Sequence, residues 1–195
     1  MSRIRFPGMK TSLIVCAALT LAALLLLLPP NLAIAQGTMT TQETLLDRIQ
    51  IGDLLTKYYV DLSSGASHDL AQYFTEDAVL DVNGTISQGR AAIEKMYGGL
   101  GGGGRSERQG RMHMLLNNLL VSVKGDTAQA WLIWTGVMND TVRLTPRLLE
   151  QGREYDELVK RNNRWYIQHR IITADSGMPA SYDSTYKPRE HPALP

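Results

Sequence analysis

Cysteine is almost missing from this chain of 195 residues. Its one cysteine, Cys16, lies inside an apolar run near the N-terminus, and residues 36–195 contain none. Those residues therefore cannot form a disulfide, a zinc site with cysteine ligands or a cysteine nucleophile. The stability of this part of the chain has to come from its hydrophobic core.

A surplus of charge of either sign is also missing. The full chain has a formal net charge of +1. This balance provides no basic surface for nucleic acid, so we expect no nucleic-acid partner. A glycine-rich stretch at residues 98–104 lacks the Lys-Ser/Thr ending of a phosphate-binding loop and follows no predicted strand. We interpret it as part of a solvent loop at residues 98–110, with a mobile flap over a pocket as the alternative.

Short metal-binding and nucleophile motifs are missing as well. The histidines do not occur at the His-x-His or His-Glu-x-x-His spacing of metal sites. A metal site built from Asp61, His113 and His169 is therefore conceivable in ligand type only, and we predict neither a metal nor a cofactor. The serines lack the nucleophile elbow of the serine hydrolases.

The N-terminus has the features of an export signal. A basic start is followed by the uncharged apolar run 11–28, which the pair Pro29-Pro30 interrupts. Ala33-Ile34-Ala35 fits the small-x-small cleavage pattern. We predict a signal peptide at residues 1–35 and hence secretion or a periplasmic location. Residues 1–35 hold three basic and no acidic residues, so cleavage after Ala35 changes the net charge from +1 to −2. An uncleaved membrane anchor is the alternative, because the run is long enough to span a bilayer.

Helix and hairpin patterns fill the first half of the remaining chain. Residues 36–43 are polar and predict a disordered linker, while residues 44–175 predict one domain without internal repeats. Asn83-Gly84 is the strongest hairpin signal, because both turn positions need a positive φ. Apolar spacing predicts helices over 43–62 and 68–74 and a third helix opening at Gly89-Arg90, with short strands over 78–82 and 85–87.

The second half predicts an antiparallel meander. Long strands twist and coil strongly, so such a sheet curls around the helices that pack on it. The expected fold is a cone-shaped α+β barrel, with three N-terminal helices packed on a strongly curved, mostly antiparallel sheet around a blind pocket. The predicted strands cover 111–123, 127–139, 152–161 and 164–175, with one helical turn at 147–150 and an extended tail over 176–195.

Six short motifs occur in order along residues 44–175. Together they resemble the SnoaL-like branch of the nuclear transport factor 2-like superfamily, which includes polyketide cyclases, scytalone dehydratase, ketosteroid isomerase and non-catalytic binding modules. The resemblance implies the fold more strongly than any reaction. It also implies a homodimer and, in the enzymes, an acid–base pair facing the pocket, at the positions of Asp61 and His113. The motifs are Tyr58-Tyr59-Val60-Asp61, Phe74-Thr75-Glu76-Asp77-Ala78, Gly89-Arg90-Ala91-Ala92-Ile93, His113 with Asn117, Gly125-Asp126-Thr127-Ala128, and Tyr155-Asp156-Glu157-Leu158 before Trp165.

Three residues are the candidate catalytic groups. Burial in an apolar pocket would raise the pKa of Asp61 and let it act as a general base or acid, whereas a solvated helix-end carboxylate is the alternative. His113 shares a strand face with Asn117 and can carry a proton near neutral pH, whereas a structural histidine is the alternative. Tyr58 lies three residues before Asp61 on the same helix face and would orient or polarise a carbonyl.

A second group of residues is predicted to line the pocket. Aromatic and adaptable side chains suit a ring-shaped apolar ligand, although such residues on strands can equally be plain core. We interpret Asp156 as an exposed or sheet-edge residue. The candidate substrate-binding residues are Asn117, Tyr59, Trp134, Met138 and His169.

These features lead to two functional hypotheses. The first is an exported, cofactor-independent lyase or isomerase of the dehydratase or cyclase type, acting on a small cyclic or polyketide-like molecule. The second is a non-catalytic module of the same fold that binds a small apolar molecule or forms a dimer. We expect a homodimer through an apolar sheet face, with the face carrying Met112, Met114 and Leu116 as the candidate.

Overall fold

The computed structural model describes residues 41–64, 67–100, 111–187 and 190–193. The predicted signal peptide, residues 36–40 of the predicted linker and most of the glycine-rich loop lie outside the described residues. Residues 40–195 form one compact unit. No helix in the described part of the chain is long and apolar enough to cross a membrane.

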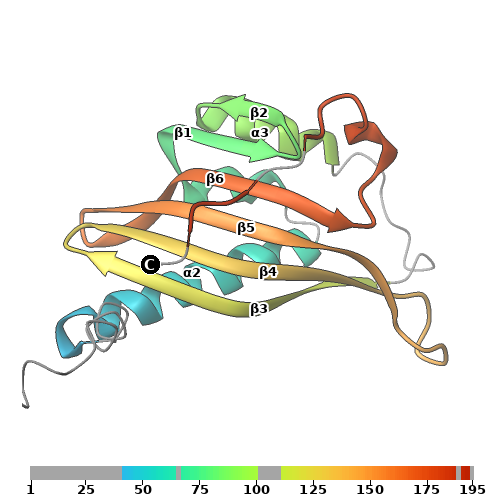
Figure 1. Ribbon diagram of the computed structural model, residues 1–195, viewed down its shortest axis with the longest axis horizontal. Helices are drawn as coiled ribbons and strands as arrows, with labels where there is room; N and C mark the ends of the chain where they lie inside the picture. The colour runs from blue at the N-terminus through green and yellow to red at the C-terminus, as the bar shows by residue number, and fades with distance from the viewer. Residues whose placement is uncertain (1–40, 65–66, 101–110, 188–189, 194–195) are drawn as a thin grey trace, which may run out of the picture. The chain divides into compact units, whose positions relative to one another are not determined.

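A curved six-stranded sheet forms the centre of the fold, and helices lie against one of its faces (Figure 1). The strand order is β2-β1-β6-β5-β4-β3, and every neighbouring pair is antiparallel except the parallel pair of β1 with β6. This arrangement confirms the predicted α+β class and the mostly antiparallel sheet. The elements are α2 (Gln42–Ser64), η3 (Ser67–Tyr73), β1 (Phe74–Val82), β2 (Thr85–Gln88), α3 (Arg90–Leu100), β3 (Arg111–Lys124), β4 (Thr127–Asn139), β5 (Arg147–Arg161), β6 (Arg164–Ser176) and η4 (Ala180–Tyr182).

The predicted hairpin forms at Asn83-Gly84. Asn83 and Gly84 have φ values of 52° and 89°, and the Asp81 carboxylate accepts a hydrogen bond of 2.9 Å from the Gly84 amide. The side-chain oxygen of Asn83 also accepts the Ala174 amide at 2.8 Å, which joins the turn to β6. The turn residues therefore both close the hairpin and attach it to the main sheet.

Gly89-Arg90 connects the third helix to the first strand. Gly89 has a φ of 82°, and its amide donates to the Ala78 carbonyl at 2.7 Å. Arg90 then donates from Nε and Nη2 to the Phe74 carbonyl at 3.1 and 2.6 Å. These bonds explain why the Phe74 and Gly89-Arg90 motifs, which are far apart in sequence, belong together in the fold.

Three local predictions are wrong. The second N-terminal helix is a 3₁₀ helix, and Phe74 begins β1 instead of ending that helix, because it pairs with Ile167 of β6. Residues 147–150 belong to β5 and pair with β4, so the helical turn expected there does not form. The third helix continues to Leu100, through glycines that the sequence assigned to a loop.

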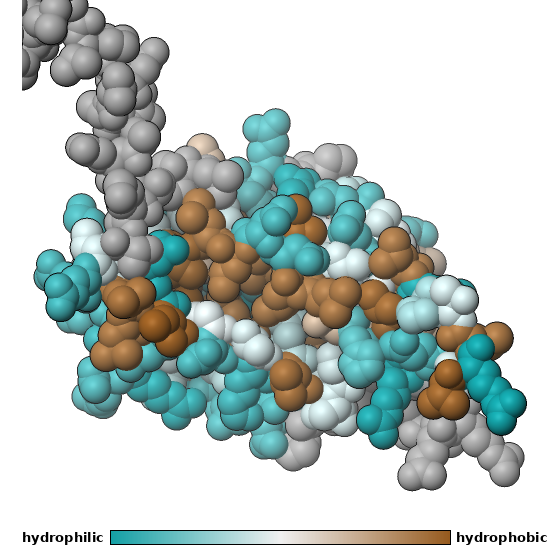
Figure 2. Space-filling model, turned by 90° about the horizontal axis from the view of Figure 1, so that it is seen from below, coloured by the Kyte–Doolittle hydropathy of each residue, from teal (hydrophilic) through white to brown (hydrophobic). Residues whose placement is uncertain are grey.

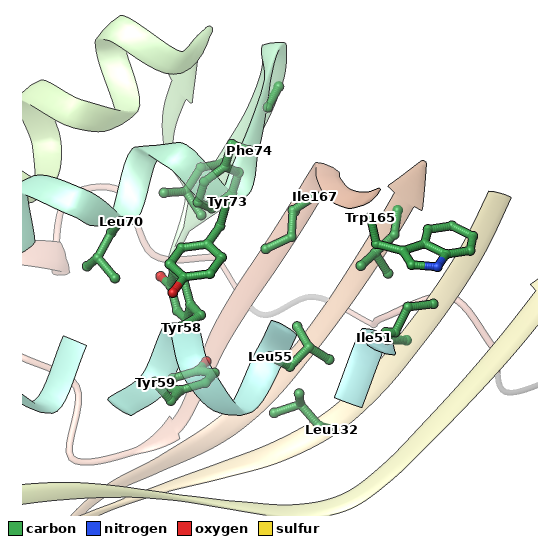
Figure 3. Close-up of a cluster of buried hydrophobic side chains, with 14 of the residues drawn as sticks. Ile51, Leu55, Tyr58, Tyr59, Leu70, Tyr73, Phe74, Leu132, Trp165 and Ile167 are labelled. Carbon is green, nitrogen blue, oxygen red and sulfur yellow. The ribbon is translucent and has the colours of Figure 1, made fainter. Parts of the chain in front are cut away.

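The core lies between α2 and the sheet face that it covers. Ile51 and Leu55 of α2 are fully buried and face Leu132, Trp165 and Ile167 of the sheet (Figure 3). Strand alternation then decides which side chains of each strand belong to this inner face.

The inner face of β3 carries the side chains that the dimer prediction had assigned to the outside. Met114 and Leu116 are half-buried and pack against the core. His113, Leu115 and Asn117 alternate with them and are exposed on the outer face. Met114 and Leu116 are therefore partly covered within one chain, so less of this face is free for pairing than the prediction assumed. The homodimer itself stays a prediction.

Apolar side chains also gather on the surface around α2 and the edge strand β3. Figure 2 shows a band of hydrophobic side chains across the face seen from below, where these two elements lie in Figure 1. β3 is an edge strand, and among the described strands it pairs with β4 alone. The exposed apolar residues of these two elements include Leu45, Leu46, Ile49, Leu115 and Leu119.

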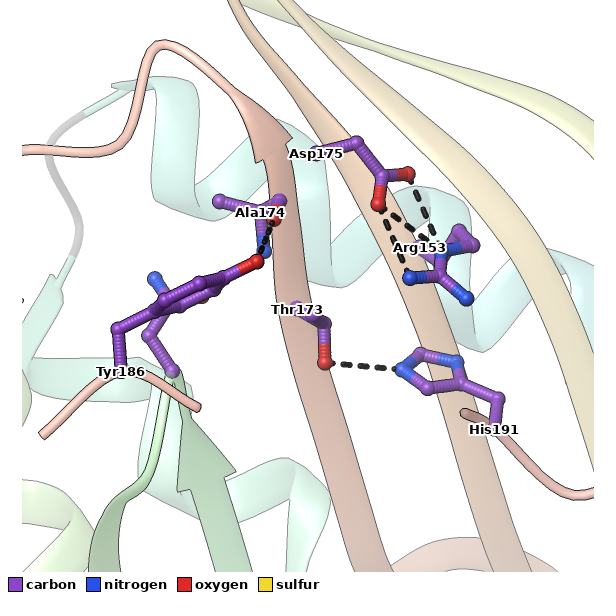
Figure 4. Close-up of polar contacts among 7 residues, drawn as sticks. Arg153, Thr173, Ala174, Asp175, Tyr186 and His191 are labelled. Carbon is purple, nitrogen blue, oxygen red and sulfur yellow. Dashed lines mark hydrogen bonds and ion pairs between the residues drawn. The ribbon is translucent and has the colours of Figure 1, made fainter. Parts of the chain in front are cut away.

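The C-terminal tail is folded against the outer face of the sheet, whereas an extended tail was predicted. It contains η4, and three later residues of the tail contact the sheet, two of them drawn in Figure 4. The Tyr186 hydroxyl donates to the Ala174 carbonyl at 3.3 Å, and His191 Nε2 shares a hydrogen bond of 3.0 Å with the Thr173 hydroxyl. The Trp131 indole donates to the Pro192 carbonyl at 2.9 Å, and only 7% of Trp131 is exposed.

Deleting residues 183–195 should expose Trp131 and lower the free energy of unfolding by about 2–4 kcal/mol, because four hydrogen bonds to the sheet and hairpin would be lost. The measurement is the tryptophan emission maximum, which should shift to longer wavelength, together with urea unfolding. Trp134 and Trp165 lie in the core and should not contribute. In a Trp131→Phe background the same deletion should cause no shift, and an unchanged emission in the wild-type background would contradict the docked tail.

Candidate functional site

A cluster of five aromatic rings forms where α2 meets η3, β1 and α3. Tyr58 lies at its centre and makes edge-to-face contacts with Tyr59, Tyr73, Phe74 and Tyr97, at centroid distances of 5.0, 5.7, 6.2 and 6.2 Å. All five rings are buried. Edge-to-face packing places the positive ring edge on the negative face of its neighbour. We call these residues the aromatic cluster.

Two consecutive tyrosines of α2 point to different partners. Successive helical residues are separated by about 100° around the helix axis, so the hydroxyl groups of Tyr58 and Tyr59 point in different directions. The Tyr58 hydroxyl is hydrogen-bonded to that of Tyr97 in α3, whereas the Tyr59 hydroxyl donates to Glu154 of β5. Tyr58 and Tyr59 were both predicted as site residues, and the structure places them side by side in the aromatic cluster.

A buried charged group lies against this cluster on the inner face of β5 and β6. Arg170 donates from Nε and Nη2 to the two carboxylate oxygens of Asp156, at 2.6 and 3.1 Å. Its Nη2 also lies 3.0 Å from Glu154 Oε1, and its guanidinium carbon lies 4.2 Å from the centroid of the Tyr58 ring. Arg170 and Asp156 are fully buried and Glu154 is 1% exposed. We call these three residues the buried charge group.

The buried charge group is neutral overall when Glu154 keeps its proton. One guanidinium neutralises one carboxylate, and Asp156 makes both of the direct hydrogen bonds to it. Burial raises the pKa of Glu154 well above its usual value; the Arg170 charge opposes this shift, and the neighbouring Asp156 carboxylate adds to it. Burial likewise raises the pKa of Tyr59 and Tyr97, which stay neutral hydroxyls at physiological pH.

Asp61 lies at the end of α2, on the rim of the aromatic cluster. Its carboxylate accepts hydrogen bonds from the Tyr73 hydroxyl at 2.6 Å and from Lys57 Nζ at 3.0 Å, and 16% of the side chain is exposed. The hydrogen bond from Tyr73 and then that from Lys57 lower the pKa of Asp61. This direction is opposite to the one predicted from burial, because two donors outweigh the partial loss of water.

His113 lies on the other side of the sheet from the aromatic cluster. It is exposed on the outer face of β3, opposite Val137 of β4. Asn117 shares that face as predicted, and its side-chain amide donates to the Thr135 hydroxyl at 3.3 Å. His169 is on the outer face of β6, with Nδ1 3.8 Å from Glu157 Oε2. The structure thus brings Asp61, Tyr58 and Tyr59 together and leaves the two predicted histidines outside this group.

Trp134 and Met138 lie on the inner face of β4. Trp134 is buried in the core, against Gly152 of β5, where a Cβ would come within 2.4 Å of the indole ring. Met138 is half-buried at the end of the same row. No group of three acidic or histidine side chains in the described part of the chain is placed to hold a metal ion.

Sequence reasoning missed several polar residues of the site. Asp156 was interpreted as exposed or at a sheet edge, but β5 lies between β4 and β6 and buries it completely. Glu154, Arg170 and Tyr73 were not predicted at all. Glu154 and Asp156 are two residues apart on one strand, which places both on one face, but nothing local shows that the cation opposite them is buried too.

Comparison with known proteins identifies a family for most of this chain. A family model described as a SnoaL-like domain matches residues 43–171. None of the curated proteins matches the sequence.

Several solved structures share the fold at low sequence identity. A protein of unknown function from Mycobacterium tuberculosis has a TM-score of 0.58 and 24% identity, covering 73% of this chain and 78% of its own. A protein from Novosphingobium aromaticivorans, named as a putative scytalone dehydratase, has a TM-score of 0.58 and 20% identity, with 70% and 89% coverage. An NTF2-like protein with a cystatin-like fold from the same organism has a TM-score of 0.54 and 20% identity, with 92% and 99% coverage.

Proposed function

We propose that this chain, which belongs to the SnoaL-like domain family, is a cofactor-independent lyase or isomerase in which Asp61 is the general base. The observation that supports this most directly is the pair of Asp61 and Tyr73. It places a partly exposed carboxylate 2.6 Å from a phenolic hydroxyl, at the rim of a buried aromatic cluster.

The two groups of this pair suit opposite halves of a proton transfer. The lowered pKa of Asp61 keeps its carboxylate ionised and able to accept a proton at neutral pH. Burial and the hydrogen bond to Asp61 raise the pKa of Tyr73, so its hydroxyl keeps its proton and can donate a hydrogen bond. A substrate carbonyl that replaced Asp61 as the partner of Tyr73 would be polarised while Asp61 removed the adjacent proton.

The substrate class follows from the surroundings of this pair. The Tyr73 ring packs edge-to-face on Tyr58, which in turn packs on Phe74, and a small cyclic or polyketide-like molecule would match this aromatic environment. The solved structure named as a scytalone dehydratase supports the same type of reaction. His113 remains a predicted participant, but its exposed position on the outer face gives no support to a role beside Asp61, so the proposed transfer uses Asp61 and Tyr73. We also propose that the protein is exported after cleavage near Ala35.

This function can be tested without knowledge of the natural substrate. In D₂O, the purified protein should catalyse exchange of the proton next to the carbonyl in small cyclic ketones, followed by proton NMR. Asp61→Asn should lower the exchange rate by about 10²–10⁴-fold, the usual contribution of a general base. Tyr73→Phe should lower it as well, because the carbonyl would lose its hydrogen-bond donor.

The matched control is Asp53→Asn, which changes an exposed carboxylate on the same helix. It should leave the exchange rate unchanged, and all three variants should keep melting temperatures close to that of the wild type. Exchange that survives Asp61→Asn but is lost in His113→Ala would contradict the assignment of the base.

One observation favours a binding module as the second candidate. A carboxylate with a lowered pKa is a weaker base than one tuned toward neutral pH. In a binding module, Asp61 and Tyr73 would only position a ligand. Ligand binding without exchange, equal in the wild type and in Asp61→Asn, would support this second function.

A further inference from the structure

A pocket of about 290 Å³ lies where β5 begins and β6 ends. Its size is at the lower end of the range for small-molecule sites, so it suits a molecule with a single ring. It draws on β4, β5, β6 and the start of the tail, and it includes no member of the aromatic cluster or the buried charge group. Its lining residues are Thr135, Leu148, Leu149, Glu150, Gln151, Ser176 and Gly177.

Two irregularities of strand pairing lie at this pocket, one in β5 and one in β6. Leu148 pairs with Val137 and Glu150 with Gly136, which leaves Leu149 as an extra residue opposite β4. Between β5 and β6, Gln151 pairs with Ser176 and Gly152 with Ala174, which leaves Asp175 as an extra residue of β6. Bulges of this kind re-aim side chains and are common beside functional sites.

The backbone at Gly177 holds the pocket in shape. Gly177 has a φ of 70°, and a Cβ there would lie 2.1 Å from the Leu149 carbonyl oxygen. No other residue could follow β6 this closely without moving one of the two segments. The tail therefore closes against the bulge of β5 at a fixed distance.

Glu150 supplies an acidic group that no cation of the described chain neutralises. Its side chain folds over Gly136, where a Cβ would lie 2.8 Å from the Glu150 Cγ. No described residue makes a hydrogen bond or ion pair with its carboxyl group, and burial raises its pKa. Burial and then the charge of Glu150 raise the pKa of Tyr182 in η4. A partly buried carboxylate without a partner loses hydration that a bound cation would replace.

The other residues that line the pocket include both polar and apolar side chains. The Thr135 hydroxyl accepts hydrogen bonds from Asn117 and Gln151, at 3.3 and 3.1 Å, so its own proton remains available to donate. Leu148 and Leu149 are 78% and 40% exposed and provide apolar surface beside Glu150.

We propose that this pocket binds a small organic cation, in which a primary ammonium group pairs with Glu150 and a ring or short hydrocarbon chain packs on Leu148 and Leu149. The site should bind this cation more tightly than a neutral molecule of the same shape, because only the cation neutralises the charge of the Glu150 carboxylate. The site is independent of the proposed proton transfer at Asp61.

Calorimetric titration of the purified full-length protein at about pH 8 tests the site, with benzylammonium as the probe and benzyl alcohol as its neutral counterpart. Benzylammonium should bind at least about tenfold more tightly. Glu150→Gln should remove this difference, and Leu149→Ala should weaken the binding of both molecules. In the wild type, amide NMR shifts on adding benzylammonium should be largest at Leu149, Gln151 and Ser176.

The matched control is Glu157→Gln, which removes a carboxylate from the same strand at an exposed position and should keep the preference for the cation. No binding of either probe, equal binding of the two, or a preference that survives Glu150→Gln would each overturn the proposal. None of these results depends on the exchange activity assigned to Asp61.

Discussion

Arg170→Met is expected to lower the free energy of unfolding by about 3–5 kcal/mol, the cost of leaving a buried ion pair without one partner. Asp156 would remain fully buried as an uncompensated carboxylate, because both of its hydrogen bonds to the guanidinium would be lost. The Tyr58 ring would also lose the cation on its face. Domains of this size are stable by only about 5–15 kcal/mol, so the variant should be close to unfolding. Urea unfolding at neutral pH measures the effect.

The matched control is Arg164→Met. Arg164 begins the same strand, but it is exposed and lies over Tyr166, with 5.0 Å between its guanidinium carbon and the ring centroid. Its replacement should change the stability by no more than about 0.5 kcal/mol. A loss of similar size in both variants would mean that the buried ion pair is not the cause.

A second change should restore much of the stability. Replacing a complete buried ion pair with apolar residues of similar volume is often neutral or stabilising. The double variant Arg170→Met with Asp156→Leu should therefore be more stable than Arg170→Met alone. A loss of less than about 1 kcal/mol in the single variant would contradict a large cost for leaving Asp156 buried without its cation.

The local signals of the sequence predicted the elements well, because those signals act over a few residues. Asn83-Gly84 needs only its own φ values to form a hairpin, and the structure confirms the turn. The long first helix and the strands of the meander follow apolar spacing within each segment. The helical turn predicted at residues 147–150 does not form because a contact distant in sequence, the pairing with β4, outweighs the local preference of these residues.

The assignment of strand faces could not be made from the sequence. Alternation correctly put His113 and Asn117 on one side of β3 and Met114 and Leu116 on the other. It could not show which side meets α2, because both sides carry leucines or methionines. The prediction therefore assigned the core-facing side of β3 to a dimer surface and its outer face to the pocket wall.

The candidate site was predictable only where its contacts are local. Lys57 lies four residues before Asp61, so their ion pair is visible in the helix spacing. Tyr73 reaches Asp61 only because η3 folds back on α2, and Arg170 meets Asp156 only because β5 and β6 pair in one register. Polar residues on a strand are exposed by default, and only a partner on another strand makes their burial possible.

Glu154→Gln is expected to remove part of the pH dependence of stability. The pKa of Glu154 is raised well above its usual value in the folded protein, while the unfolded chain has an ordinary carboxyl group. Between the pKa of Glu154 in the unfolded chain and its higher pKa in the folded protein, the folded protein therefore holds up to one proton more than the unfolded chain. Its stability contribution is complete below that pKa and is lost as the pH rises toward the folded pKa, by up to about 1.4 kcal/mol per pH unit.

The amide of glutamine has nearly the shape of the protonated carboxyl group and can still accept the hydrogen bond from Tyr59. The variant should therefore gain stability relative to the wild type as the pH rises. Urea unfolding of both proteins at several values between about pH 6 and pH 8 measures the difference, and groups common to both proteins cancel. Glu157→Gln, which changes an exposed carboxyl group on the same strand, serves as the control. A difference that did not change with pH would mean that Glu154 is ionised, and that the single guanidinium of Arg170 holds two buried carboxylates.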